Sequence, residues 1–199
     1  MGNVIAMDAY TGNEIWWKTL GNPVNINRIP MPNGSGMIWA YGVYNYHAVD
    51  TDTLYITATN RGLDFFTDGL DGYKEAPPDT IKQGLKNGTI YALDLLTGSI
   101  KWKLDIEFPP RVSPIVTNDL LITGYLPFNK DSKSGIILAL DKHTGEMLWK
   151  FDVNAPIGPV GMSFGNDMLF VPTGKLITDN DQSEDRAEGS IIAFHIGLP

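Results

Sequence analysis

Residues 2–17 read GNVIAMDAYTGNEIWW, residues 88–103 read GTIYALDLLTGSIKWK, and residues 135–150 read GIILALDKHTGEMLWK. The three stretches align without a gap and share Gly, Ala, Asp, Thr-Gly and Trp at equal spacings. A fourth copy, residues 189–199, reads GSIIAFHIGLP and has His195 in the position of the Asp. Three gapless copies of one pattern indicate an internal repeat.

Each copy has the pattern of a β-hairpin. The apolar run of each copy is short and bounded by Gly and a turn, which is typical of a strand buried on both faces. The Asp at the start of the turn can accept hydrogen bonds from backbone amides two or three residues on, and the Gly supplies a left-handed conformation. The Trp falls in the second strand. Helical periodicity is almost absent, and the one candidate helix, Pro78–Lys86, has one or two turns.

A second pattern lies between the copies. Short apolar runs begin at Asp52, Asp119 and Asp167, and each run precedes the next Gly-Ala-Asp copy. The alanines of successive copies lie 86, 47 and 54 residues apart. The first unit is therefore long, and we expect it to carry insertions at about 20–42 and 61–87.

The repeat length predicts the fold. A period of 40–50 residues with about four short strands is typical of the blades of a β-propeller. A lone blade exposes two apolar faces, so neighbouring blades must stack. The small Ala allows close approach, and each Trp, which buries about 150–250 Å², fills the space between blades. We predict an all-β chain in which residues 1–199 form a single, partial β-propeller of about three to four blades.

The pattern Ala-x-Asp-x-x-Thr-Gly-x-x-x-Trp resembles the tryptophan-docking repeat of the pyrroloquinoline quinone (PQQ) propeller proteins. Because the pattern is repeated, the resemblance covers essentially the whole chain. The same repeat builds PQQ-dependent alcohol and sugar dehydrogenases, and also cofactor-free scaffolds such as the BamB-type outer-membrane assembly lipoproteins. The resemblance is therefore specific for the superfamily and much less specific for activity.

The order of segments resembles the C-terminal part of the quinoprotein alcohol dehydrogenases. GVYNYHAVDTDTLYITATN at 42–60 is followed by two docking repeats, then by APIGPVGMSFGNDMLFVPTG at 155–174 and a closing strand that ends in Leu-Pro. This order implies the C-terminal half of a larger, eight-bladed propeller. The length of 199 residues then indicates an incomplete domain.

The resemblance also implies cofactor contacts. Asn45 matches the Asn that contacts PQQ in the family, and Tyr46 replaces the usual Trp. Residues Gly174 to Leu176 match the Gly-rich loop beside the cofactor. A competing alignment places Asn60 at the position of a calcium-ligating Asn, and we prefer the first alignment because the following segments fit it better. The implied cofactor of the full-length protein is PQQ with Ca²⁺ or a lanthanide.

Three departures from the family bear on activity. The chain has no Cys, so the adjacent-cysteine disulfide of the family is missing. The family's metal-binding Glu and catalytic Asp precede the part that this chain matches. No pair of carboxylates here matches them, so we assign no catalytic residue and no metal ligand.

Composition excludes other classes of function. The chain has 15 Lys+Arg against 23 Asp+Glu, a net charge of −8 and a sequence pI near 4.7. Nucleic-acid binders need a basic surface, and so do proteins that dock on anionic membranes. No apolar run reaches 18 residues, no signal peptide opens the chain, and no phosphate-binding or hydrolase motif occurs.

Three further features of the sequence are candidate sites. His143 is expected at a solvated turn tip, His195 in a structural role, and His47, after Asn45-Tyr46, could face a central ligand. The acidic stretch 179–188 lacks the Gly and Glu of a calcium loop, so a solvated loop is the better interpretation. The aromatic and acidic insertion at 64–73 is either a cap on one face of the propeller, decoration, or an interface between protomers.

Two functional hypotheses follow. The first is part of a PQQ-dependent dehydrogenase that oxidises an alcohol or sugar in the periplasm or another extracytoplasmic space and passes electrons to a respiratory acceptor. The second is a non-catalytic, BamB-like propeller that binds a protein partner. In either case, a dimer could complete the ring.

Overall fold

The computed structural model describes the strands and turns of the repeats. The described residues are 2–21, 42–43, 45–60, 65–66, 73–74, 87–125, 127, 134–157, 161–174 and 189–196. Every regular element among them is a β-strand, as the sequence predicts. The expected helix at Pro78–Lys86 and the acidic stretch at 179–188 lie outside the described residues, as does most of both insertions.

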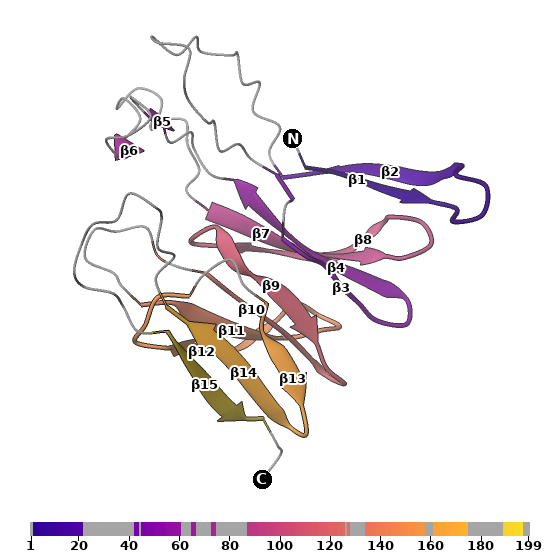
Figure 1. The fold of residues 1–199 in the computed structure, drawn as a ribbon. Helices are drawn as coiled ribbons and strands as arrows, with labels where there is room; N and C mark the ends of the chain where they lie inside the picture. Colours follow the sequence, from indigo (N-terminus) through magenta and orange to yellow (C-terminus); the bar gives the residue numbers. More distant parts are fainter. Residues whose placement is uncertain are drawn as a thin grey trace.

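Four sheets follow one another along the chain, and we number them as blades I to IV (Figure 1). Blade I is the hairpin of β1 (Gly2–Met7) and β2 (Glu14–Leu20). Blade II has the order β3 (Ala48–Val49), β4 (Thr53–Asn60), β7 (Asn87–Asp94), β8 (Ile100–Ile106). A small separate hairpin pairs β5 (Phe65–Phe66) with β6 (Tyr73–Lys74).

Blades III and IV continue the same meander. Blade III has the order β9 (Pro110–Val116), β10 (Leu120–Tyr125), β11 (Ile136–Asp141), β12 (Met147–Asp152). Blade IV has the order β13 (Ser163–Gly165), β14 (Met168–Thr173), β15 (Ser190–His195). Blades II and III are complete four-stranded sheets. Within the described residues, blade I has the two outer strands of a blade and blade IV the three inner ones.

The repeat motif occupies the same place in each blade. Ala6 pairs with Trp16, Ala92 with Trp102 and Ala139 with Trp149, and the register shifts directly after each Ala. Partners in an antiparallel pair project to the same face, so the smallest side chain of the hairpin lies beside the largest one. The predicted hairpins are confirmed.

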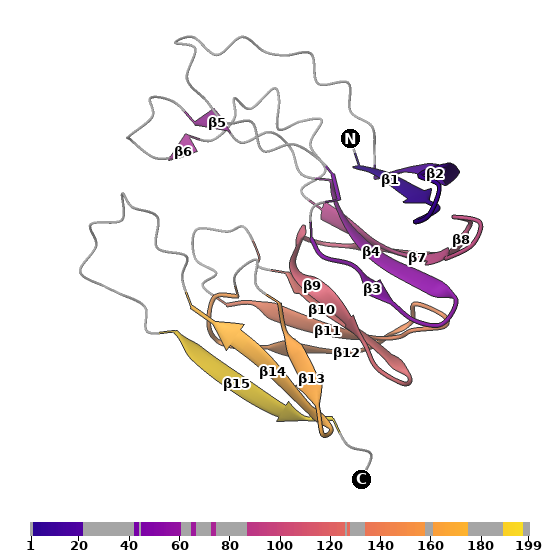
Figure 2. The same ribbon diagram turned by 45° about the vertical axis from the view of Figure 1, so that its right-hand side comes forward.

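Successive strand residues face different neighbours. In β11, Leu138 and Leu140 belong to the apolar cluster between blades II and III, whereas Ile137 and Ala139 belong to the cluster between blades III and IV. All four are fully or almost fully buried. This period of two is that of a strand covered on both faces. Figures 1 and 2 show the sheets stacked in the manner of propeller blades, which confirms the predicted all-β fold class.

The two ends of the blades differ. The Asp-x-x-Thr-Gly turns lie at one end, the turn end, where β1 meets β2, β7 meets β8 and β11 meets β12. At the opposite end, β4 and β14 finish and β9 and β11 begin. We call this opposite end the site end, because Asn45 and Gly174, two of the residues with predicted cofactor contacts, fall there.

The Asp residues that open the short apolar runs also have a shared role. The carbonyl oxygens of Asp52, Asp119 and Asp167 accept hydrogen bonds from the backbone amides of Leu95, Lys142 and Ile196, at 3.0, 3.1 and 2.7 Å. Each bond ties the turn between the inner strands of a blade to the turn that follows its third strand. The second sequence pattern therefore marks a backbone contact within each blade.

Candidate functional site

Asn45 lies at the site end, between two blades. Its Nδ2 donates hydrogen bonds to Thr57 Oγ1 of β4 at 3.1 Å and to the Pro110 carbonyl at 3.3 Å. Pro110 is the first residue of β9, the innermost strand of blade III. A carboxamide nitrogen carries two hydrogens, and both are used within the protein. Asn45 therefore joins blades II and III.

Tyr46 and His47 follow Asn45 and are more open to solvent. The side chain of Tyr46 is 82% exposed, which leaves its ring available for contact with a ligand. His47 is exposed in part, and the desolvation that it does experience lowers its pKa below the ordinary value of 6.5. The imidazole is consequently neutral at pH 7 and presents one donor and one acceptor nitrogen.

Gly174 follows β14 at the same end of the blades. Its φ is +146°, and its amide donates to the Pro156 carbonyl at 2.9 Å. A Cβ at this position would lie 3.2 Å from Gly189 Cα, so the chain passes close to the start of the fourth copy here. Leu176 lies outside the described residues, and no described contact joins Gly174 to Asn45 or Tyr46.

The residue of the competing alignment, Asn60, is the last residue of β4 and pairs with Asn87. The structure describes its backbone at the site end but not its side chain. No group of three or more His, Asp or Glu side chains among the described residues could hold a metal ion. The calcium-ligand interpretation of Asn60 therefore stays a prediction.

The other two histidines lie apart from the site end. The His143 amide donates to Asp141 Oδ1 at 2.9 Å in the turn of the third copy. His195 pairs with Met168 at the end of β15. Both residues are exposed and occupy the turn end of their blades.

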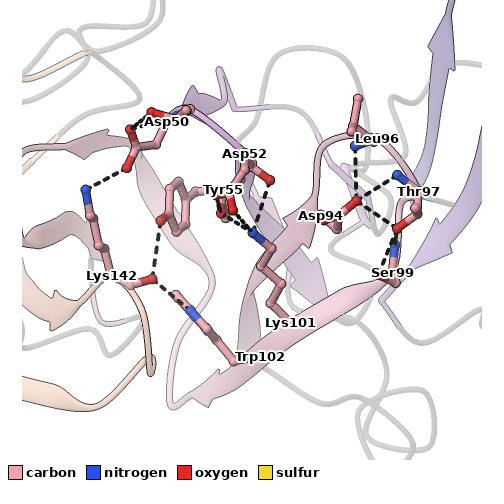
Figure 3. A network of polar contacts seen from close by, with 12 residues as sticks. Asp50, Asp52, Tyr55, Asp94, Leu96, Thr97, Ser99, Lys101, Trp102 and Lys142 are labelled. Carbon is pink, nitrogen blue, oxygen red and sulfur yellow. Dashed lines mark hydrogen bonds and ion pairs between the residues drawn. The ribbon is translucent and has the colours of Figure 1, made fainter.

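A polar network at the turn end was not foreseen from the sequence (Figure 3). Lys142 Nζ lies 2.6 Å from Asp50 Oδ2 and joins blade III to the β3–β4 turn of blade II. The Lys142 carbonyl accepts two more bonds from blade II, from Trp102 Nε1 at 2.9 Å and from the Tyr55 hydroxyl at 3.3 Å. Lys142 thus holds two blades together through its side chain and its backbone.

A second ion pair lies within blade II. Lys101 Nζ is 2.9 Å from Asp52 Oδ2 and donates to Thr53 Oγ1 at 2.8 Å. The hydrogen bond from Lys142 lowers the pKa of Asp50, and the hydrogen bond from Lys101 lowers the pKa of Asp52. Burial raises the pKa of Tyr55, so this phenol stays protonated and donates. Within blade II, Thr53 Oγ1 also donates to Asp52 Oδ1 at 2.6 Å, so the network holds the β3–β4 turn against β8.

The Asp residues of the repeat turns hold the turns together. In each turn, Asp Oδ1 accepts bonds from the backbone amides two and three residues on and from the Thr hydroxyl. The hydrogen bond from the Thr97 hydroxyl is the main cause that lowers the pKa of Asp94 below its ordinary value of 3.8. Equivalent hydrogen bonds lower the pKa values of Asp8 and Asp141.

These lowered pKa values predict acid sensitivity. The unfolded chain binds protons on these carboxyls more readily than the folded chain, so the free energy of unfolding falls as the pH drops through about 4 and below. Asp94→Asn keeps an acceptor oxygen but removes the titration, so urea unfolding of this variant should depend less on pH than that of the wild type in this range. An identical pH dependence of the two proteins would contradict the assignment.

Each buried indole is received by the turn of the following blade, in what we call the indole seat. Trp16 Nε1 donates to the Leu95 carbonyl at 3.1 Å, and Trp102 Nε1 donates to the Lys142 carbonyl at 2.9 Å. A Cβ at Gly98 would lie 2.7 Å from Trp16, and one at Gly145 would lie 2.5 Å from Trp102. The indole ring therefore lies directly on the glycine, and a side chain at the glycine position would clash with the ring.

The two ends of the blades differ in chemistry. The site end presents the exposed Tyr46 ring and the His47 imidazole beside the junction of blades II and III. The turn end has the indole seats and the ion pairs, which are contacts within and between blades. Among the described residues, no helix is long and apolar enough to cross a membrane.

Comparisons with known proteins place the chain among propellers. A europium-containing methanol dehydrogenase aligns with a TM-score of 0.53 and 18% identity over 87% of this chain and 35% of that chain. BamB from Moraxella catarrhalis aligns with a TM-score of 0.35 and 14% identity over 98% of this chain and 52% of that chain. A quinohemoprotein alcohol dehydrogenase from Pseudomonas putida HK5 aligns with a TM-score of 0.39 and 15% identity over 84% of this chain and 26% of that chain.

The chain thus spans about a third of the length of the methanol dehydrogenase that it resembles in fold. A search of curated proteins found no match. The profile of a repeat family described as outer membrane protein assembly factor BamB matches residues 1–120, which is more than half of the chain. Together with the repeated hairpins and the seated indoles, this match shows that the chain belongs to the PQQ-repeat propeller family that carries the BamB description.

Proposed function

We propose that this chain is part of a PQQ-repeat propeller that binds PQQ at the site end and oxidises an alcohol or sugar outside the cytoplasm. The proposal rests on where three residues lie. The family resemblance implies cofactor contacts for Asn45, Tyr46 and Gly174. All three lie at the same end of the blades. The two electrons would pass to a respiratory acceptor. The fold likeness to a methanol dehydrogenase supports this choice.

The described residues fit a planar ligand in part. Tyr46 presents an exposed ring on which a flat quinone can stack. Asn45 Nδ2 would have to give up one of its two bonds to contact PQQ directly. Asn45 therefore acts foremost as a positioning residue that ties the segment before β3, which carries Tyr46, to the first residue of β9. Bound PQQ supplies the electron-accepting quinone, and the metal-binding and proton-accepting carboxylates are unassigned in this chain.

PQQ titration of the intact protein, in the presence of Ca²⁺, tests the proposal. We expect saturable quenching of tryptophan fluorescence, together with dye-linked alcohol oxidation by the full-length protein. Tyr46→Ala should weaken PQQ binding about tenfold, the loss of one stacked ring. Tyr10→Ala is the matched control, because Tyr10 is 99% exposed at the turn end. Absence of saturable quenching, or equal affinity of the two variants, would refute the cofactor assignment.

A non-catalytic scaffold is the second candidate. Two observations favour it: both amide hydrogens of Asn45 are used within the protein, and the matching family carries the description of an outer-membrane assembly factor. In this case PQQ does not bind, and a protein partner is captured by the intact chain but not after deletion of residues 61–87. Such proteins and the quinoproteins are both expected in the periplasm, so location does not separate the two candidates.

A further inference from the structure

The glycine that opens each copy of the repeat lies at the site end of its blade. Gly2 begins β1, Gly88 is the second residue of β7, and Gly135 directly precedes β11. Neither Gly88 nor Gly135 has a positive φ, so the backbone conformation would accept any residue with a side chain. What these positions share is instead a very close neighbour.

At Gly88, the neighbour belongs to residues 107–110, which lead from β8 to the start of β9 and form the crossover from blade II to blade III. A Cβ on Gly88 would overlap Pro110 Cδ and would lie 3.1 Å from the Ala58 carbonyl oxygen. Pro110 is buried and pairs with Tyr125 of β10. Because it is held on both sides, Pro110 cannot yield to a side chain at Gly88 without moving the crossover.

The other opening glycines have equivalent neighbours. Residues 153–157 leave β12 toward blade IV and form the second crossover. A Cβ on Gly135 would overlap Ile157 Cγ1 and would lie 2.7 and 2.8 Å from its Cγ2 and Cδ1. A Cβ on Gly2 would lie 3.0 Å from Val43 Cγ2, in the segment that leads into blade II. In each copy, therefore, the chain that enters the next blade packs on the opening glycine.

The two crossovers also hold the residues with implied cofactor contacts. The Pro110 carbonyl accepts the hydrogen bond from Asn45 Nδ2 at 3.3 Å, and the Pro156 carbonyl accepts that from the Gly174 amide at 2.9 Å. Pro110 and Pro156 thus each lie between an opening glycine and a residue of the candidate site. A shift of either crossover would move the acceptor of one of these bonds.

We propose that Gly88 and Gly135 are positioning residues of the site end: Gly88 fixes Asn45 through Pro110, and Gly135 fixes Gly174 through the crossover of residues 153–157. The absence of a side chain lets each crossover lie directly on the third strand of its blade and sets the place of its carbonyl. That this placement serves PQQ rests on the proposed function, whereas the placement itself does not.

Nuclear magnetic resonance of the intact, isotope-labelled chain tests the placement without any ligand. Gly88→Ala should shift the carboxamide signal of Asn45, which its loss in Asn45→Asp identifies, and should leave the backbone amide signal of Gly174 unchanged. Gly135→Ala should do the reverse, so each variant is the control for the other. Shifts of both signals in both variants, or of neither signal, would mean that the glycines affect only overall packing and would overturn the proposal.

Rescue by a second substitution separates a steric cause from a general loss of stability. Pro110→Ala removes Cδ but keeps the carbonyl, so adding Gly88→Ala to it should leave the Asn45 signal where Pro110→Ala alone puts it. Ile157→Ala likewise removes the atoms that a Cβ on Gly135 meets. If Gly88→Ala alone does not fold and the double variant does, the steric assignment is supported. A shift as large with the second substitution as without it would contradict the assignment.

Titration with PQQ and Ca²⁺ then tests the link to the cofactor. Gly88→Ala should weaken binding about tenfold, the loss of about one positioned contact, and Pro110→Ala should restore it in the double variant. Gly145→Ala is the matched control, because its Cβ would clash with Trp102 at the turn end, and its affinity should equal that of the wild type. Equal affinity of Gly88→Ala and the wild type would refute the role toward PQQ. No binding to the wild type would refute the proposed function instead, and the resonance shifts would still decide the positioning role.

Discussion

Gly145→Ala is expected to lower the free energy of unfolding by about 1–3 kcal/mol more than Gly12→Ala, although the two glycines have nearly the same backbone conformation. Both have positive φ, +76° and +72°, so both alanines bear a strain of about 1–2 kcal/mol. Only at Gly145 does the added Cβ meet a ring, 2.5 Å from Trp102 Cε3 and 2.7 Å from Cδ2. Overpacking of this kind costs about 1–3 kcal/mol.

Urea unfolding of the two variants measures the difference, with Gly12→Ala as the control for strain alone. The double variant Gly145→Ala with Trp102→Ala separates the clash from the strain, because the second change removes the ring that the new Cβ meets. In that background, Gly145→Ala should cost no more than Gly12→Ala does in the wild type. If the two single variants lose the same stability, Trp102 does not rest on the Gly145 turn.

Trp16→Ala should be far more destabilising than Trp17→Ala, even though the two residues are adjacent. Trp16 is 9% exposed, belongs to the cluster between blades I and II and donates to the Leu95 carbonyl. Its loss should cost about 3–5 kcal/mol, as for other large-to-small changes of a buried aromatic residue. Trp17 is 53% exposed on the opposite face of β2 from Trp16, and its replacement should change stability by about 0.5 kcal/mol.

Trp16→Phe separates the two parts of the expected loss of stability, the packing of the ring and the hydrogen bond of its N–H. The phenyl ring keeps part of the packing but has no N–H, which leaves the Leu95 carbonyl without this donor and costs about 1 kcal/mol. Thermal unfolding of the three variants gives the order of stability, with Trp17→Ala nearest to the wild type and Trp16→Ala the least stable. A Trp17→Ala protein as unstable as Trp16→Ala would contradict the assignment of faces.

The hairpins could be predicted from the sequence because Ala, Asp, Gly and Trp recur at equal spacing and each has a separate steric or hydrogen-bonding role. The burial of the tryptophans between blades was predicted for the same reason. The partner of each indole was not predictable. Trp16 rests on Gly98, in the turn of the following copy, and Trp102 rests on Gly145. Spacing within one copy places a ring on a face of the sheet but does not say which residue of a neighbour it meets.

The ion pair of Asp50 and Lys142 shows the same limit. The two residues are 92 positions apart and lie in turns of different blades, so no local pattern connects them. At the site end, the resemblance gave positions for Asn45 and Tyr46 but not their surroundings. That the Asn45 amide bonds Pro110 of the next blade depends on how two sheets stack. Leu176 and the acidic stretch 179–188 lie outside the described residues, so those predictions stay open.

The direction of the indole contacts bears on how such a chain can change in length. Blades I and II each pass a ring to the turn of the blade after them, and the same atoms serve at both of these junctions. Duplication of one whole repeat therefore recreates a junction that already exists and requires no new interface. Deletion of one whole repeat restores the same contact between the blades that remain. A gene that encodes this array can thus gain or lose blades in single recombination steps, while insertions that break the spacing from Ala to Trp cannot be absorbed.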